Sequence, residues 1–382
     1  MHNRRIAGVV VSLTAALAVA ACGSSSSSSS SASSSGGAAG SSSSSSGGSG
    51  GGNVTATLNG AGSTLAAPIY EQWAQTLKSK GLTVNYNAVG SGAGQTQLAS
   101  ATVGFAGSDP ALKPADKKTM KGPVLQFPVA AGAITVSYNL PGVKSGIKLD
   151  GPTLADIFSG KITKWNDSAI TKLNPGMSLP STSITVVHRS DSSGTTAGFT
   201  KYLAAVSPAW NSSIGTGKDV KWPVGTGAAK NSGVAAAVKQ TTGAVGYVEQ
   251  AYAIENGFTY ASIKNSAGTY IEPTIPNTSN AFLGIKIPSD LGISTINSPN
   301  AGAYPIVSQT FIEAYKDPCK DGGLSSNTAK GLNEWLTYAI GDGQKTLGAG
   351  SNQLPYAPLP SSLLGKDQAQ LKTMTCNGSP LS

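Results

Sequence analysis

Short apolar runs with strand-like alternation recur along the chain from about residue 53 onward. Period-two alternation predicts a strand over residues 83–88. Runs rich in β-branched and apolar residues at 133–138 and 184–187 predict two more strands. None of these runs is long enough to be a helix of ordinary length, so we expect a sheet of short strands.

Helix-period segments lie between these strands. Pro68 suits the start of a helix whose apolar face carries Ile69, Trp73 and Leu77. Residues 153–156 resemble a capping box ahead of another apolar run. Further helices are expected over residues 198–205, 234–240 and 327–339. The alternation of strands and helices predicts an α/β fold, in which ligands bind at strand carboxyl ends and helix amino ends.

The first residues are typical of an export signal rather than of a folded element. Arg4 and Arg5 precede an apolar run over residues 6–21, and this run ends in small residues immediately before Cys22. Small residues before a cysteine resemble a lipobox, in which the cysteine is acylated and becomes the mature N-terminus. We therefore interpret residues 1–21 as a lipoprotein signal peptide and Cys22 as the lipidation site.

Residues 23–52 contain only Ser, Gly and Ala. Such a tract has no apolar surface to bury, and we expect a random coil with a reach of roughly 30 Å. Together with Cys22 it forms a predicted tether, residues 22–52, between a membrane and a folded body. No later stretch contains 18 uninterrupted apolar residues, so membrane contact through the N-terminal lipid alone is expected.

The charge of the remaining chain is mildly basic. Without Arg4 and Arg5 the chain has 25 basic and 18 acidic residues, a net charge of +7. This balance is compatible with an anionic ligand. The lysines are scattered rather than gathered in an arm or stripe, so nucleic-acid binding is not expected.

Cysteine and histidine usage limits the chemistry further. Cys319 and Cys376 are an even pair in a chain with an export signal, and the default expectation is a disulfide between them. His188 is the one histidine after the signal. Metal sites built from His and Cys, and Cys–His nucleophile pairs, are therefore excluded, and no metal or other cofactor is expected.

Four clusters of glycine and hydroxyl residues each follow a predicted strand and precede a predicted helix. They occupy residues 60–65, 90–94, 107–110 and 189–196. Glycine lets the backbone approach a ligand, and the free N–H groups of a helix's first turn favour an anion. One such cluster is usually only a turn, but four in one exported chain indicate an anion site.

Three charged residues refine this hypothesis. Arg189 offers a planar fork of donors suited to an oxyanion, and Asp191 could hold that guanidinium by an ion pair. A carboxylate at Asp109 would repel an anion unless it accepted a proton that the ligand carries. Phosphate near neutral pH carries a proton and sulfate does not. Asp109 is equally suited to be a helix N-cap before Pro110, so both interpretations stay open.

At this point the ordered motifs resemble the phosphate-specific substrate-binding proteins of bacterial ABC importers. The similar segments lie in the same order over nearly the whole body: residues 60–70, 89–92, 105–109, 154–167, 188–195, 221–223 and 246–249. The resemblance implies a type II periplasmic-binding-protein fold with two lobes and a ligand cleft between them. It also implies that the protein binds inorganic phosphate and is not an enzyme.

The resemblance implies a ligand set at matching positions. Those positions are Thr64, Leu65 through its backbone N–H, Ser91, Asp109, Arg189, Ser193, Gly194 and Thr195. Asp191 is expected to support Arg189. Leu65 stands where relatives often carry Phe, which should not disturb a main-chain donor, and the loop at Ser91 departs slightly from the family pattern.

Two chain crossings between the lobes are also implied, near residues 128–136 and 304–310. Lobe I would then combine residues 53–131 with 304–382, and lobe II would span residues 132–303. Cys319 and Cys376 would lie in the same lobe. The expected partners are inorganic phosphate and the permease subunits of an ABC importer, with the protein a monomer anchored by lipid on the extracytoplasmic face of the cell membrane.

Three other functions are compatible with parts of the sequence. A secreted phosphatase-like hydrolase is disfavoured because His188 and Arg189, as neighbours on a strand, face opposite ways. No nucleophile elbow occurs outside the tether. A binding protein for another oxyanion, such as sulfate or molybdate, is disfavoured by Asp109. A surface adhesin or antigen without a transport role stays open.

Overall fold

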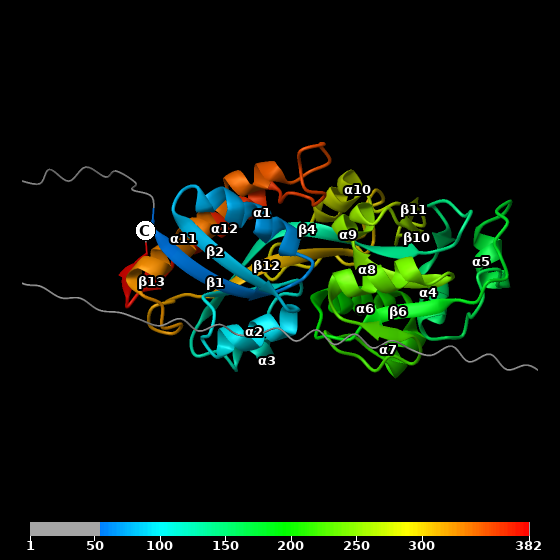
Figure 1. The fold of residues 1–382 in the computed structure, drawn as a ribbon, viewed down its shortest axis with the longest axis horizontal. Helices are drawn as coiled ribbons and strands as arrows, with labels where there is room; N and C mark the ends of the chain where they lie inside the picture. The colour runs from blue at the N-terminus through cyan, green and yellow to red at the C-terminus, as the bar shows by residue number, and fades with distance from the viewer. Residues whose placement is uncertain (1–53, 382) are drawn as a thin grey trace, which may run out of the picture. The chain divides into compact units, whose positions relative to one another are not determined.

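The computed structural model describes residues 54–381. The predictions on residues 1–52, including the signal, Cys22 and the tether, lie outside the described residues. Figure 1 shows helices covering one long sheet at both of its ends. The strands are β1 (Ala56–Gly62), β2 (Leu82–Ala88), β3 (Phe105–Ser108), β4 (Val124–Tyr138), β5 (Lys148–Leu149), β6 (Thr185–Arg189), β7 (Thr226–Ala228), β8 (Ala244–Glu249), β9 (Thr259–Tyr260), β10 (Ser262–Lys264), β11 (Tyr270–Ile271), β12 (Val307–Tyr315), β13 (Thr375–Cys376) and β14 (Ser379–Pro380).

The helices alternate with these strands, as the sequence predicts for an α/β fold. They are α1 (Ala67–Lys78), α2 (Ser91–Ala99), α3 (Pro114–Lys117), α4 (Gly151–Phe158), α5 (Ser168–Leu173), α6 (Gly194–Val206), α7 (Pro208–Ser213), α8 (Lys230–Gln240), α9 (Gln250–Glu255), α10 (Ile275–Ser279), α11 (Ser326–Ala339) and α12 (Ser361–Leu371), with 3-10 turns at Asn280–Phe282 and Asp342–Thr346. None of these helices is both long and apolar enough to cross a membrane.

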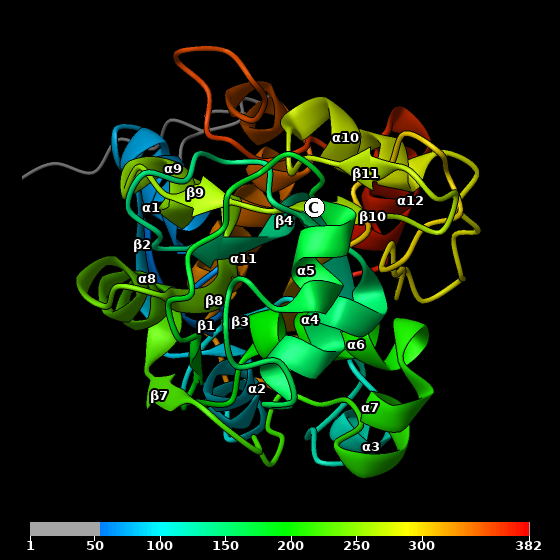
Figure 2. The same cartoon turned by 90° about the vertical axis from the view of Figure 1, so that its right-hand side faces the viewer.

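The main sheet has two parallel parts joined by two antiparallel strands. Its order is β2-β1-β3-β12-β4-β8-β6-β7, with β9 also paired to β4. β1 pairs in parallel with β2 and β3, and β6 pairs in parallel with β7 and β8. β4 pairs antiparallel with β12 over its first part and with β8 over its last part. β4 and β12 therefore connect the two lobes, as Figure 1 shows, and Figure 2 views the molecule from the end that carries α5.

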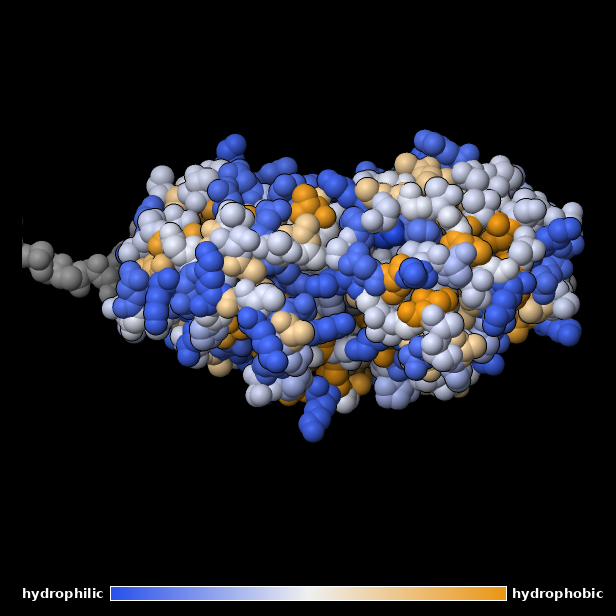
Figure 3. Space-filling model, turned by 90° about the horizontal axis from the view of Figure 1, so that it is seen from below, coloured by the Kyte–Doolittle hydropathy of each residue, from blue (hydrophilic) through white to orange (hydrophobic). Residues whose placement is uncertain are grey.

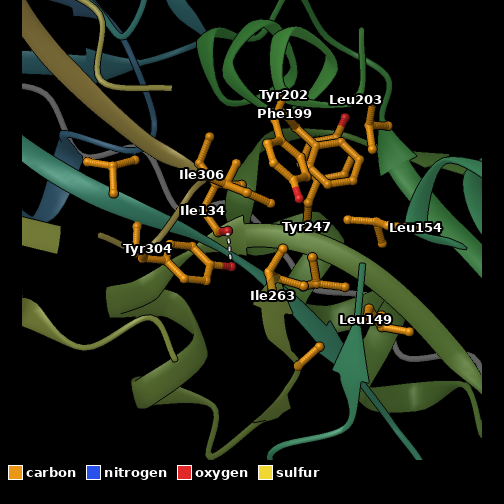
Figure 4. Packing of buried hydrophobic residues seen from close by; sticks show 14 of the residues in the cluster. Ile134, Leu149, Leu154, Phe199, Tyr202, Leu203, Tyr247, Ile263, Tyr304 and Ile306 are labelled. Atoms are coloured by element: carbon orange, nitrogen blue, oxygen red, sulfur yellow. Dashed lines mark hydrogen bonds between the residues drawn. The ribbon is translucent and has the colours of Figure 1, made fainter. Parts of the chain in front are cut away.

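Each lobe has its own apolar core. In the first, Trp73 of α1 and Trp335 of α11 pack edge to face, with ring centroids 5.9 Å apart. In the second, the rings of Phe199 and Tyr247 stack at 4.4 Å between α6 and β8. Figure 4 shows this second core, where the Tyr304 hydroxyl donates to the carbonyl of Ile134 at 2.9 Å. Burying each large apolar side chain contributes about 1.5–3 kcal/mol.

The predicted disulfide is confirmed. Cys319 and Cys376 are bonded to each other and join the segment after β12 to β13, 57 residues further on. Both residues pack against the apolar core of the first lobe. The exact lobe boundaries at residues 131, 132, 303 and 304 stay predictions.

Several expected element boundaries are corrected. Helix α4 begins earlier than the expected capping box, because the side chain of Asp150 accepts a hydrogen bond from the N–H of Thr153 and caps the helix. Thr153 is thus inside the first turn. Helices α6 and α8 each begin four residues before their apolar periodicity, since their first turns hold polar and small residues. β4 is longer than expected because it serves both lobes.

Candidate anion-binding site

The four glycine and hydroxyl clusters lie at the carboxyl ends of parallel strands β1, β2, β3 and β6. Three of them lead into α1, α2 and α6, as expected. The third cluster differs, because no helix begins directly after Asp109 and α3 starts only at Pro114. Asp109 is therefore not a helix cap in this structure.

Arg189 at the end of β6 is buried, with 4% of its surface exposed. Its Nε donates to Asp191 Oδ1 at 2.7 Å, and its Nη2 donates to Asp191 Oδ2. Nη1 donates to Thr195 Oγ1 at 3.4 Å. Burial opposes ionisation of Asp191, but the hydrogen bond and charge of Arg189 outweigh it and hold the pKa of that carboxyl below its usual value. The guanidinium is thus fixed along one edge by a carboxylate.

Asp109 lies in the other lobe and is also buried, at 3% exposure. Its Oδ1 accepts a hydrogen bond from the hydroxyl of Ser63, and its backbone N–H donates to Ser91 Oγ at 3.3 Å. Burial raises the pKa of Asp109 to about 6, although Ser63 and the charge of Arg189 oppose the shift. The carboxylate is a hydrogen-bond acceptor whose ionised form this site disfavours.

The turn between β1 and α1 supplies Thr64 and Leu65. Both residues are buried. The N–H of Leu65 donates to Ser63 Oγ at 3.0 Å, so this main-chain donor already has a partner inside the protein. Thr64 Oγ1 accepts from the side chain of Asn231 at 2.9 Å.

The start of α6 supplies Ser193, Gly194 and Thr195. Ser193 is the N-cap, and its hydroxyl accepts from the N–H of Thr196 at 3.1 Å. Gly194 and Thr195 are the first two residues of the helix, where N–H groups have no partner within the helix itself. These donors and the positive end of the helix dipole favour an anion.

The starts of α2 and α6 each contact a residue of the other lobe. The N–H of Gly92 donates to the carbonyl of Ser192 at 3.1 Å. A Cβ atom at position 194 would overlap Asp109 Oδ2, and one at position 92 would overlap Ser192 Oγ. Only residues without a side chain allow this close approach. Gly194 therefore brings α6 directly against Asp109.

The structure brings all eight predicted ligand residues into one buried region at the junction of the lobes. Thr64 and Thr195 are linked through Asn231, Arg189 contacts Thr195, and Asp109 packs on Gly194. Their roles toward a ligand stay predictions. A cavity of about 190 Å³ borders Asp109 and is also lined by two exposed lysines, Lys113 and Lys201.

Sequence reasoning missed two residues of this region, Ser63 and Asn231, which are both fully buried. Ser63 stands inside the first glycine and hydroxyl cluster, so its hydroxyl was a visible signal. Asn231 belongs to none of the four clusters, and its position depends on how α8 packs against β8 and β6.

His188 takes no part in the hydrogen bonds of the Arg189 side chain, which go to Asp191 and Thr195. Its ring stacks on Trp222 with centroids 4.8 Å apart, and its pKa is lowered by burial. Within residues 54–381, no three His, Cys, Asp or Glu side chains gather in a group that could hold a metal ion.

The face of the molecule that carries α2, α3 and α7 is mostly hydrophilic, with small separate hydrophobic patches (Figure 3). No single broad apolar surface is visible from this side. The predicted ligand residues are instead buried at the junction of the lobes.

Comparisons with known proteins identify relatives of this chain. The model of the PBP superfamily domain matches residues 31–342. The chain is 40% identical to the phosphate-binding protein PstS of Pasteurella multocida over 321 residues, which cover 83% of this chain and 90% of that protein. It is 38% identical to the protein of the same name from Haemophilus influenzae, covering 83% and 93%. The fold is similar to a phosphate-binding protein structure from Stenotrophomonas maltophilia, with a TM-score of 0.62 and 21% identity, covering 85% of this chain and 96% of that one.

The raised pKa of Asp109 predicts that the folding stability of the ligand-free protein depends on pH. Because the folded-state pKa is about 6 and the ordinary value is 3.8, the folded state favours the protonated carboxyl. Stability should therefore fall as pH rises from about 4 to 6, and stay lower above that range, by about 2–3 kcal/mol. Asp109→Asn carries no charge and should melt at a higher temperature than wild type at pH 7.5, with no difference near pH 4.

Asp317→Asn is the matched control. Several backbone N–H groups donate to Asp317, and although burial acts the other way, these hydrogen bonds hold the pKa of its carboxyl at about 2. That substitution should lower the melting temperature at pH 7.5. Calorimetry of the three phosphate-free proteins makes the comparison, and an Asp109→Asn protein that melts at or below the wild-type temperature at pH 7.5 contradicts the prediction.

Proposed function

The chain belongs to the PBP superfamily and, within it, to the PstS phosphate-binding proteins, and from this premise we propose that it binds inorganic phosphate and delivers it to an ABC importer. The single observation that carries the proposal is the buried guanidinium of Arg189, held by Asp191 at the junction of the lobes and facing the first turn of α6.

The proposed ligand contacts divide into donors and one acceptor. Arg189, the hydroxyls of Thr64, Ser91 and Thr195, and the main chain at the start of α6 supply donors. Asp109 is the acceptor and takes a proton that the ligand carries. Ser193 caps the helix that presents Gly194 and Thr195, and Leu65 lines the site beside Thr64. Ser63, which is not among the ligand residues predicted from the sequence, donates to the Asp109 carboxylate and orients it.

Binding and closure follow from the placement of these groups. Lobe I, residues 53–131 with 304–382, would supply Thr64, Ser91 and Asp109. Lobe II, residues 132–303, would supply Arg189 and the start of α6. An anion contacting both sets stabilises the closed arrangement, because each lobe alone offers only part of the donors. β4 and β12 cross between the lobes and would act as the hinge.

The same proposal assigns the ends of the chain. Residues 1–21 would be a lipoprotein signal, Cys22 the acylated residue, and residues 22–52 the tether. The protein would then be a monomer on the extracytoplasmic face of the cell membrane, where it meets the importer's permease subunits. A binding role without catalysis is supported by relatives named for phosphate binding, and neither a hydrolase nor a carrier of another oxyanion is favoured.

Arg189→Met tests the phosphate site directly. The change removes the cation and leaves the partly exposed Asp191 carboxylate without its partner. Losing one member of such a charged pair costs about 2–5 kcal/mol. Isothermal titration should therefore show phosphate affinity falling by at least tenfold. Lys161→Met removes an exposed cation that pairs with Asp156 at 3.1 Å, and it should bind as wild type does. Equal affinities for all three proteins would exclude Arg189 from the site.

Selectivity tests the role of Asp109. Phosphate has a proton to donate to this carboxylate and sulfate has none, so sulfate would leave the acceptor unpaired and be repelled by it. Buried partners of this kind discriminate by roughly 10⁴–10⁵-fold. In Asp109→Asn the charge is absent and an N–H can donate to sulfate, while the amide oxygen still accepts from phosphate. Competition titrations at one pH should show measurable phosphate binding and a smaller phosphate-to-sulfate ratio. An unchanged ratio would mean that selectivity comes from other residues.

Lipid attachment is tested at the N-terminus. Cys22→Ser removes the thiol that would be acylated, and the variant should be shed into the medium or keep its signal. Fractionation followed by mass spectrometry of the mature N-terminus decides this. An unmodified wild-type N-terminus at another residue would refute the proposal.

A further inference from the structure

Asn231 at the start of α8 lies at the centre of the hydrogen bonds that join the two lobes. It is fully buried. Its Nδ2 donates to Thr64 Oγ1 at 2.9 Å and to Thr195 Oγ1 at 3.3 Å. Its Oδ1 accepts from the N–H of Glu249 at 3.0 Å. One side chain thus contacts a hydroxyl from each side of the proposed cleft.

The orientation of this amide is determined by its partners. The backbone N–H of Glu249 can only donate, so the atom facing it must be the amide oxygen of Asn231. The NH₂ group then faces the two threonines, and each of its two hydrogens has one hydroxyl oxygen as acceptor. Exchanging the amide oxygen and nitrogen would set two donors against each other at Glu249.

The two hydroxyl oxygens have no acceptor capacity left. Thr64 Oγ1 accepts from Asn231 Nδ2 and, at 3.3 Å, from the backbone N–H of Asn231. Thr195 Oγ1 accepts from Asn231 Nδ2 and from Nη1 of Arg189. A hydroxyl offers two lone pairs and one proton, so each threonine retains only its O–H as a free hydrogen-bonding function.

These two protons lack an acceptor among residues 54–381, since neither hydroxyl donates to any described atom. Both threonines are buried, at 3% and 0% exposure. A buried O–H without an acceptor is costly, so its partner is expected to be a ligand oxygen.

We propose that Asn231 is a positioning residue that fixes the hydroxyls of Thr64 and Thr195 as obligatory donors to the bound oxyanion. This inference rests on the proposed function and deepens it. Asn231 does not need to touch the ligand. By filling the lone pairs of both hydroxyls, it leaves a ligand acceptor oxygen as the partner each proton requires, and it disfavours ligand groups that can only donate.

The backbone holds Asn231 in place for this task. The preceding residue, Lys230, has a φ of 65°, in the left-handed region that residues with side chains seldom adopt. Its N–H donates to Asp191 Oδ1 at 3.0 Å, and the same oxygen accepts from Arg189 Nε. Asp191 therefore positions both the cation and the start of α8, which couples the orientation of the hydroxyls to that of the guanidinium.

Two substitutions separate this role from simple packing. Asn231→Ala removes the donors and frees the hydroxyls to point elsewhere, and phosphate affinity should fall roughly 10- to 100-fold, as for lost hydrogen bonds to a charged group. Asn231→Asp has nearly the same shape but offers acceptors where Asn231 offers donors. Thr64 and Thr195 would then donate to the carboxylate instead of the ligand, so affinity should fall further than in Asn231→Ala. Isothermal titration with inorganic phosphate measures both.

The control is a second buried asparagine with a full set of amide bonds. Asn265 donates to the carbonyls of Ala301 and Ala303 and accepts from the N–H groups of Ala267 and Thr269, away from the site. Asn265→Asp should lower the melting temperature and leave phosphate affinity unchanged. Melting curves of the phosphate-free variants establish that each one is folded before its affinity is compared.

A double-mutant cycle with Thr64→Val decides whether Asn231 acts through the hydroxyls. If it does, Asn231→Ala should cost clearly less affinity in the Thr64→Val background than in wild type, because one of its two targets is gone. Equal losses in both backgrounds, or an Asn231→Asp protein that binds as tightly as Asn231→Ala, would overturn the proposal. A wild-type protein that fails to bind phosphate would instead refute the proposed function, so the two failures are distinguishable.

Discussion

The buried guanidinium of Arg189 pairs with the partly exposed carboxylate of Asp191, and the arrangement of the remaining site depends on this ion pair. A guanidinium in a buried place needs a carboxylate partner, or its desolvation would not be compensated. Asp191 fills that need along one edge of the fork and also accepts from the N–H of Lys230. Removing the carboxylate would therefore release the cation and the start of α8 together. One acidic side chain orders two separate parts of the site.

The sheet explains why these groups meet at all. β1, β2 and β3 end at the site from one lobe, and β6 ends with Arg189 from the other. Because β4 pairs with β12 over one part and with β8 over the other, a single strand sets the position of both parallel parts. Gly92 at the start of α2 then allows close contact with Ser192, and Gly194 at the start of α6 allows close contact with Asp109. The continuous strand β4 sets the positions of the two parts of the site. The glycines leave the space that lets these parts touch.

Much of this arrangement could be predicted from local patterns. The glycine and hydroxyl clusters, Arg189 with Asp191, and the α/β alternation are each visible within a few residues of sequence. Asn231 could not be found this way, because its function depends on contacts with Thr64 and Thr195, which are distant in the chain. The cap of α4 was misplaced for a related reason, since Asp150 and residues 153–156 both offer plausible caps and only the backbone path decides between them. Local chemistry is readable from sequence, whereas the partners that complete it come from packing.

The numbers of hydrogen-bond donors and acceptors in the site determine which ligands would suit it. Asp109 is an acceptor whose ionised form is disfavoured by burial, and Ser63 is turned toward it. Around it stand groups that can only donate: a guanidinium, the N–H groups at the start of α6, and two threonine hydroxyls whose lone pairs are filled. Under the proposed function, such a set would require a ligand with many acceptor oxygens and at least one proton. A fully deprotonated oxyanion would give no hydrogen bond to the Asp109 oxygen that Ser63 does not contact, and a ligand rich in donors would leave the threonine protons without an acceptor. The proposed selection of a protonated oxyanion then follows from the rule that buried polar groups must have hydrogen-bond partners. Attraction between opposite charges alone would not distinguish such a ligand from other anions.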